Sequence, residues 1–103
     1  MKKKSPSTPS AKNSASNNIE IVFTRQAVED LEEWDEKDKA KVKRISRLIE
    51  AIKANPRKGI GKPEQLQHQF SGYWSRRIDK KHRLIYRIEG DKVTVISCRG
   101  HYD

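Results

Sequence analysis

The sequence contains a single cysteine, Cys98, and no long run of apolar residues. One thiol excludes an internal disulfide framework and a cysteine-rich zinc site, and it is typical of a protein in a reducing compartment. No apolar stretch approaches the roughly 20 residues that a membrane-spanning helix needs. Three lysines, at positions 2–4, resemble the start of a signal peptide, but no apolar segment follows them. We therefore expect a cytoplasmic protein that does not insert into a membrane.

Acidic residues are also scarce relative to basic ones. Lys and Arg total 23 against 14 Asp and Glu, which gives a net charge of +9. Such an excess attracts polyanions and speeds their encounter, so nucleic acid is the expected partner and an anionic membrane surface is the second candidate. The alternative is that the charge serves only solubility. With 103 residues, 33% of them hydrophobic, the chain has material for one domain with a small core.

Residues 1–18 differ from the rest in composition. They are rich in Ser, Asn and Pro and contain four lysines and no acidic residue. So few apolar residues cannot offset the entropy of ordering, and we expect a disordered basic tail. It either adds a weak, salt-sensitive attraction to RNA or is an inert leader. The single domain is expected over residues 19–103.

A strand and two helices are predicted in the first half of this domain. The apolar, β-branched run Ile19–Phe23 predicts a strand, and Thr24 is a suitable cap for the helix that follows it. A polar break is expected over Asp35–Asp38. The second helix is predicted over 38–54 and ends at Asn55-Pro56. Its apolar stripe consists of Val42, Ile45, Leu48, Ile49 and Ile52.

The second half predicts an antiparallel meander after a loop over 57–67. Strands are expected over 73–78, 82–88 and 92–99, separated by turns. Alternation should place Trp74, Ile78, Leu84, Tyr86, Ile88, Ile96 and Cys98 on a face that packs against the helices. The opposite face should carry Ser75, Arg77, Arg83, Arg87, Ser97, Arg99 and His101. Arg76 interrupts the apolar set, and Ile85, Val93 and Val95 interrupt the polar one.

An arginine-rich sheet face requires counter-charges. Acids such as Glu64 and Asp79 could provide them, and so could an RNA backbone, because guanidinium groups match phosphate oxygens. Internal RNA cleavage needs a base for the 2′-hydroxyl, an acid for the leaving 5′-oxygen and positive charge for the phosphorane. Glu64, His68, His82 and His101 are the available acid–base groups. Their spacing does not match a metal site, so we expect neither a metal nor another cofactor.

Four blocks of sequence carry a family resemblance. They are GKPEQL at 61–66, SGYWSRRI at 71–78, HRLIY at 82–86 and CRGHY at 98–102. In order and spacing they resemble the YoeB (Txe) toxins of the RelE/ParE superfamily, over residues 19–102. The resemblance implies an α+β fold of the RelE-like, microbial RNase-like kind, with a helix hairpin on a small twisted, mainly antiparallel sheet in the order β-α-α-β-β-β-β.

The resemblance also implies a function. YoeB toxins belong to type II toxin–antitoxin systems and cleave messenger RNA in the ribosomal A site, yielding a 2′,3′-cyclic phosphate and a 5′-hydroxyl. Glu64 matches the general base, His101 the general acid and Arg83 the arginine that stabilises the phosphate. Tyr102 matches a tyrosine that orders the substrate, and Arg77 a basic residue near the scissile phosphate. A YefM-like antitoxin partner and a homodimer are also implied.

Two positions depart from the family pattern. Gln67 stands where some relatives carry a lysine near the RNA, so one phosphate contact is either weaker or supplied by Lys62 or His68. Arg99 is a further candidate on the basic face. Asp103 either raises the pKa of His101 by proximity or has no effect. Two other functions stay open: a ParE-like gyrase poison, which generally lacks Glu64 and the His101-Tyr102 end, and a passive RNA-binding module, for which the basic face alone suffices.

Overall fold

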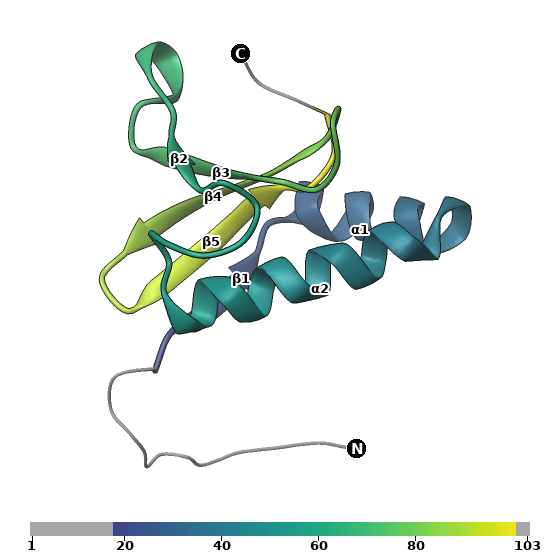
Figure 1. Ribbon diagram of the computed structural model, residues 1–103, viewed down its shortest axis with the longest axis horizontal. Helices are drawn as coiled ribbons and strands as arrows, with labels where there is room; N and C mark the ends of the chain where they lie inside the picture. The colour runs from purple at the N-terminus through teal and green to yellow at the C-terminus, as the bar shows by residue number, and fades with distance from the viewer. Residues whose placement is uncertain (1–17, 101–103) are drawn as a thin grey trace.

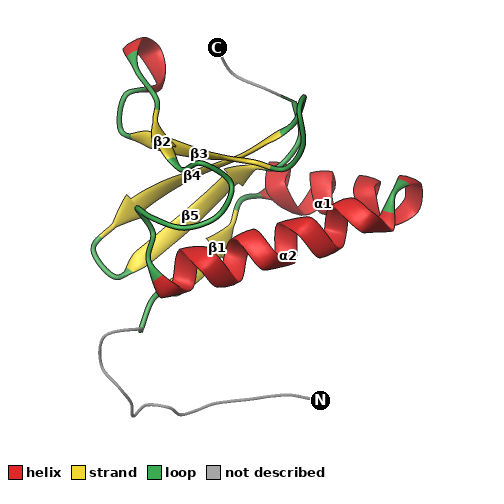
Figure 2. Ribbon diagram, in the orientation of Figure 1, coloured by secondary structure: helices red, strands yellow, loops and turns green. Residues whose placement is uncertain are grey.

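The computed structural model of the protein describes residues 18–100. The predicted disordered tail, apart from Asn18, lies outside these residues, as do His101, Tyr102 and Asp103. Within residues 18–100, two helices lie on one side of a five-stranded sheet (Figures 1 and 2). No helix in this part of the chain is long and apolar enough to span a membrane.

The two helices are separated by one residue, Asp38. Helix α1 spans Arg25–Lys37, and α2 spans Lys39–Ala54. The Asp38 amide donates to Trp34 O at 2.7 Å, and its carboxylate accepts from Ala40 N at 3.2 Å, so Asp38 ends α1 and caps α2. The predicted break over Asp35–Asp38 is therefore too long. Ion pairs four residues apart, such as Lys39–Asp35, stabilise helical backbone on both sides of Asp38.

The sheet has the order β1-β5-β4-β3-β2. Its strands are β1 (Glu20–Phe23), β2 (Glu64–Gln65), β3 (Tyr73–Arg77), β4 (Arg83–Glu89) and β5 (Lys92–Ser97). β1 pairs in parallel with β5, and the other pairs are antiparallel. The α+β class and element order are confirmed. The short β2 lies inside the segment that was predicted to be a loop, and a single 3₁₀ turn, η3 (His68–Phe70), follows it.

The core lies between the helices and one sheet face. Ile45, Leu48 and Ile52 of α2 pack with Leu84, Tyr86, Val93, Val95 and Cys98. The prediction that Ile96 belongs to this face, and that Val93 and Val95 do not, is wrong. In the β4–β5 register Ile85 pairs with Ser97 and Tyr86 with Val95, so Ile96 is an extra residue, a β-bulge. A bulge reverses the alternation, which is why odd-numbered valines and even-numbered Cys98 share one face.

Candidate active site

The sheet face away from the helices brings together three of the predicted site residues. Glu64 of β2 pairs with Ser75 of β3, and two residues farther along β3, Arg77 pairs with Arg83 of β4. Paired residues and residues two apart point to the same face. A strand spacing of about 4.8 Å and a rise of about 3.4 Å per residue put the Cα atoms of Glu64 and Arg83 about 12 Å apart. Side chains of this length can approach one phosphodiester group from two sides.

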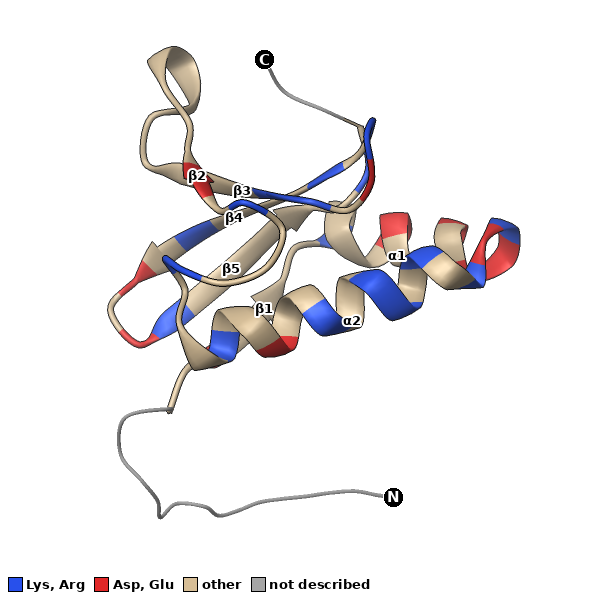
Figure 3. Ribbon diagram, in the orientation of Figure 1, with Lys and Arg blue, Asp and Glu red and all other residues tan. Residues whose placement is uncertain are grey.

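Positive charge dominates this part of the molecule. Figure 3 shows Lys and Arg along β3, β4 and the turn between them, with an acidic position on β2. Within residues 18–100, none of the ion pairs includes Glu64, Arg77 or Arg83. The alternative in which Glu64 and Asp79 neutralise the arginines is therefore not what the structure shows.

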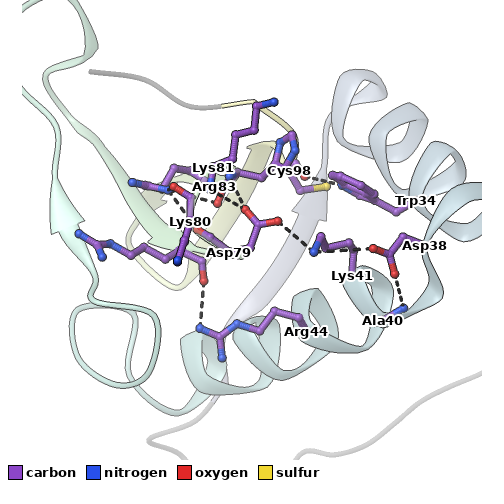
Figure 4. Close-up of polar contacts among 12 residues, drawn as sticks. Trp34, Asp38, Ala40, Lys41, Arg44, Asp79, Lys80, Lys81, Arg83 and Cys98 are labelled. Carbon is purple, nitrogen blue, oxygen red and sulfur yellow. Dashed lines mark hydrogen bonds and ion pairs between the residues drawn. The ribbon is translucent and has the colours of Figure 1, made fainter.

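The Arg83 guanidinium lies against the turn that joins β3 to β4. Its Nη1 donates to the carbonyl oxygens of Asp79 at 3.3 Å and of Lys80 and His82 at 3.4 Å (Figure 4). These bonds engage one guanidinium nitrogen, and no bond from Nε or Nη2 is found within residues 18–100. The turn therefore fixes the direction of the side chain while leaving donors for an anionic ligand.

Asp79 organises this turn. Its Oδ1 accepts from the amides of Lys81 at 2.7 Å and His82 at 2.6 Å, and its Oδ2 pairs with Lys41 of α2 at 2.9 Å (Figure 4). Burial acts to raise the pKa of the Asp79 carboxyl. The bonds from His82, Lys41 and Lys81 outweigh burial and hold this pKa well below its usual range. The hydrogen bond to Asp79 correspondingly raises the pKa of Lys41. The sequence pattern gives no signal of this arrangement, because Lys41 and Asp79 lie in different elements.

The end of the described chain is fastened beside Arg83. The Gly100 amide donates to His82 Nδ1 at 2.8 Å, and the Gly100 carbonyl accepts from Arg83 N at 2.8 Å. The His82 ring meets Trp34 edge to face, with centroids 4.9 Å apart. Trp34 Nε1 donates to Cys98 O at 2.8 Å. The segment that precedes His101 is therefore held to both β4 and α1. From its sequence context His82 is only an acid–base candidate, and the structure gives it this anchoring role.

The remaining predicted residues are more dispersed. Glu64 and His68 line a hollow of about 590 Å³ formed by residues 64–70. Lys62 is exposed in the loop just before β2. Arg99 instead lines a separate hollow of about 440 Å³ with Gln26 and Asp30 of α1. His101 and Tyr102 lie outside the described residues.

The described residues bring together no group of side chains suited to a metal ion. Among residues 18–100, no cluster of three or more His, Cys, Asp or Glu side chains could hold a metal ion.

Cys98 is fully buried, as expected, and burial, together with the charge of Asp30, raises its pKa to about 12. A buried protonated thiol is a poor nucleophile.

Known proteins resemble the chain over nearly the whole described region. Residues 23–102 match the family described as YoeB-like toxin of bacterial type II toxin–antitoxin system. Toxin YoeB of Streptomyces coelicolor is 48% identical over 82% of this chain and 100% of its own length. Toxin RelK of Mycobacterium tuberculosis is 51% identical over 80% of this chain and 96% of its own length.

Solved structures lead to the same family. A YoeB/ParE toxin from Agrobacterium tumefaciens is 42% identical, with a TM-score of 0.77 over 82% of this chain and all of that chain. A YoeB dimer from Staphylococcus aureus is 41% identical, with a TM-score of 0.76 over 82% and 99% of the two chains. YoeB in a heterotetrameric YoeB–YefM complex from the same organism is 41% identical, with a TM-score of 0.74 over 82% of this chain and 98% of that chain. The chain therefore belongs to the YoeB-like toxins of bacterial type II toxin–antitoxin systems and has the RelE-like fold.

Proposed function

We propose that this toxin is a ribosome-dependent endoribonuclease that cleaves messenger RNA in the A site and so inhibits translation. The observation that carries the proposal is the arrangement of Glu64, Arg77 and Arg83 on one sheet face. Neither arginine has a carboxylate partner within residues 18–100, and the phosphate of a bound RNA is a counter-charge that matches guanidinium geometry.

In the proposed reaction, the Glu64 carboxylate accepts the proton of a ribose 2′-hydroxyl. The 2′-oxygen attacks the adjacent phosphorus, the bond from phosphorus to the 5′-oxygen breaks, and the His101 imidazolium protonates that leaving oxygen. The products are a 2′,3′-cyclic phosphate and a 5′-hydroxyl. Arg83, with Arg77 beside it, balances the charge that develops on the phosphorane. No metal or cofactor takes part in these steps.

The surroundings of these residues support the assignment. His101 is bonded directly to Gly100, whose carbonyl accepts from Arg83 N. Lys62 and His68 lie close to Glu64 in the sequence and would contact neighbouring phosphates of the RNA. Tyr102 would order the substrate, while Arg99, in its hollow beside α1, would make a more distant contact.

The relatives' assemblies indicate the protein partners. Because the Staphylococcus aureus relatives form a YoeB dimer and a YoeB–YefM complex, we include a YefM-like antitoxin and a homodimer in the proposal. The site of action is the cytoplasm, where translating ribosomes and messenger RNA are found.

The test is a translating extract that contains one defined message. Purified protein is added, new 5′ ends are mapped, and the 3′ ends are analysed for cyclic phosphate. Wild type should cut at the A-site codon and leave a 2′,3′-cyclic phosphate. Glu64→Gln, Arg83→Ala and His101→Ala should each lower the cleavage rate by about 10²-fold or more. Arg47→Ala, which removes an exposed arginine on α2, is the matched control and should cut normally.

Three results would contradict the proposal. Cuts that persist in Arg83→Ala and His101→Ala would remove these residues from the chemistry. An intact message with signs of DNA damage in expressing cells would support a gyrase poison. Binding of RNA without cleavage products would support a passive RNA-binding module.

A further inference from the structure

Strand β3 carries a buried cation on the face that packs against the helices. Arg76 is 0% exposed and pairs across the sheet with the core residue Leu84. Burial of a charge costs free energy unless the charge is paired and hydrogen-bonded. Within residues 18–100, no carboxylate forms an ion pair with Arg76. Hydrogen bonds to neutral acceptors offset the cost of burying the Arg76 charge. The positions of those acceptors indicate what Arg76 does.

Most of these acceptors belong to the segment that connects α2 to β2. Arg76 Nη2 donates to Asn55 O at 2.8 Å and to Lys58 O at 3.0 Å, and Nη1 donates to Ile60 O at 3.1 Å. Nε donates to the Tyr86 hydroxyl at 3.0 Å, and that hydroxyl donates to Pro56 O at 2.7 Å. Two side chains of the sheet thus bind four carbonyl groups of residues 55–60, which we term the connecting segment.

The connecting segment and the residue after it pack closely around Arg76. A Cβ atom on Gly59 would lie 3.0 Å from Arg76 Nη1. A Cβ atom on Gly61 would lie 2.7 Å from Leu48 Cδ2 and 3.1 Å from Arg76 Cβ. Both glycines also have positive φ angles, of 128° and 84°. The path of the chain is therefore fitted to this particular side chain.

The same path leads directly to Glu64. Strand β2 has two residues, both exposed, so it has little packing of its own to hold it. Before it, Gly61 O accepts from Arg77 N at 2.7 Å, and after it, Leu66 N donates to Tyr73 O at 2.9 Å. Because so short a strand is oriented mainly by its flanks, the position of the Glu64 carboxylate depends on the connecting segment.

We propose that Arg76, together with Tyr86, is a positioning residue for Glu64. Its guanidinium fixes the connecting segment and thereby holds the carboxylate at a set distance from Arg77 and Arg83 on the opposite face. Arg76 itself does not touch the RNA, because its side chain lies in the core. This inference rests on the proposed function, and it gives Arg76 a role that differs from those of Arg77 and Arg83.

The first experiment reports on the connecting segment without RNA. Arg76→Met removes the guanidinium at similar length, and Tyr86→Phe removes one hydroxyl from a folded core. Ile52→Val, which trims a buried α2 side chain outside the segment, is the matched control for lost stability. Trypsin should cut the Lys58–Gly59 bond about tenfold faster in the first two variants, in proportion to local opening, and at the wild-type rate in the control.

The second experiment measures message cleavage by the same proteins. For Arg76→Met we expect kcat to fall about 10²-fold with KM within about twofold, because small displacement of a base costs rate more than binding. Tyr86→Phe should give a smaller loss in the same direction. In a Glu64→Gln background, Arg76→Met should cause almost no further loss, whereas a purely structural role would give the same loss in both backgrounds.

The outcomes distinguish a failure of the positioning role from a failure of the proposed function. The positioning role is overturned if wild type cuts message while the folded Tyr86→Phe variant keeps a wild-type kcat and resists trypsin as wild type does. This outcome decides the matter even if Arg76→Met does not fold. Equal losses with and without Glu64 also overturn it. If wild type itself cuts no message, the proposed function fails, and the positioning of a catalytic base fails with it.

Discussion

Arg77 and Arg83 face each other directly across β3 and β4, with their side chains on the same face of the sheet. Like charges in this arrangement repel, and no carboxylate within residues 18–100 pairs with either of them. The fold therefore retains a local repulsion that a bound polyanion would relieve. On the proposed function, this arrangement would favour RNA binding at the expense of the stability of the free protein.

Removal of one member of this pair should stabilise the free protein. At low salt, Arg77→Ser is expected to raise the free energy of unfolding by about 0.5 kcal/mol. The gain should vanish near 1 M salt, where the Debye length is about 3 Å. Urea unfolding at the two salt concentrations measures this, with Arg47→Ser on α2 as the control for net charge. The same gain in both variants would mean that the facing geometry is irrelevant.

The Asp79 carboxylate should make stability depend on pH in the acid range. Its pKa is lowered in the folded protein, so its contribution is complete above the unfolded-state pKa of about 3.9 and is lost progressively as the pH falls below it. Asp79→Asn keeps an oxygen for the turn amides but loses the ion pair with Lys41. We expect it to be about 1 kcal/mol less stable than wild type at pH 7, with the difference closing toward pH 2.

Lys41→Met is the matched variant for this prediction, because it removes the same ion pair from the α2 side. Urea unfolding of the three proteins from pH 7 to pH 2 measures the differences. A stability gap that stays constant over this range in Asp79→Asn would show that the ion pair and the lowered pKa do not stabilise the turn.

The glycine before Lys62 should tolerate no side chain. In Gly61→Ala the new Cβ would lie 2.7 Å from Leu48 Cδ2, in a backbone conformation with φ of 84°. We expect a loss of about 2–3 kcal/mol, which combines overpacking with backbone strain. Gly90→Ala is the control, since it has φ of 59° but open space around it, and it should lose only about 1 kcal/mol. Equal losses in denaturant unfolding would assign the whole effect to the backbone.

The Cys98 thiol should resist modification in the folded protein. It is fully buried, and burial raises its pKa to about 12, so very little thiolate is present at pH 8. An aromatic disulfide reagent should react with it only at the rate of unfolding and should react promptly in strong denaturant. Rapid reaction of the native protein would contradict the buried position beneath α1.

Sequence patterns were sufficient for most of the elements. Apolar spacing predicted α2 within one residue of its observed start, and alternation assigned Leu84 and Tyr86 to the core. The failure at Ile96 has a specific cause, because a one-residue bulge shifts the alternation without changing composition. The family resemblance implies four strands after the helices, but alternation does not locate β2, because its two exposed residues carry no pattern of their own and depend on their pairing with β3.

The candidate site was predictable in part, because some of its residues belong to sequence motifs and others act only through tertiary contacts. Glu64, Arg77 and Arg83 were identified through motif resemblance, and the strand register brings them to one face. The residues that support them were not identified. Arg76 was treated as an interruption of the apolar set, since a sequence does not reveal that four neutral acceptors surround a buried cation. Contacts between distant segments are decided by tertiary packing, which periodicity does not encode.

The contact between His82 and Gly100 provides a last prediction, which concerns the approach to His101. His82 Nδ1 accepts from the Gly100 amide, so that nitrogen carries no proton in this arrangement. His82→Leu removes the acceptor, and the Gly100 amide should then exchange with solvent at least tenfold faster. His82→Asn presents an oxygen near the Nδ1 position and should retain much of the protection.

Hydrogen exchange followed by NMR measures the Gly100 amide directly, and the Val95 amide in the centre of β5 is the internal control. Faster exchange at both amides would indicate a general loss of stability. Faster exchange at Gly100 alone, with slower message cleavage in His82→Leu than in His82→Asn, would assign His82 the task of holding the chain end that carries the proposed general acid. Unchanged exchange at Gly100 in His82→Leu would show that the bond between Arg83 N and Gly100 O is sufficient to anchor that end.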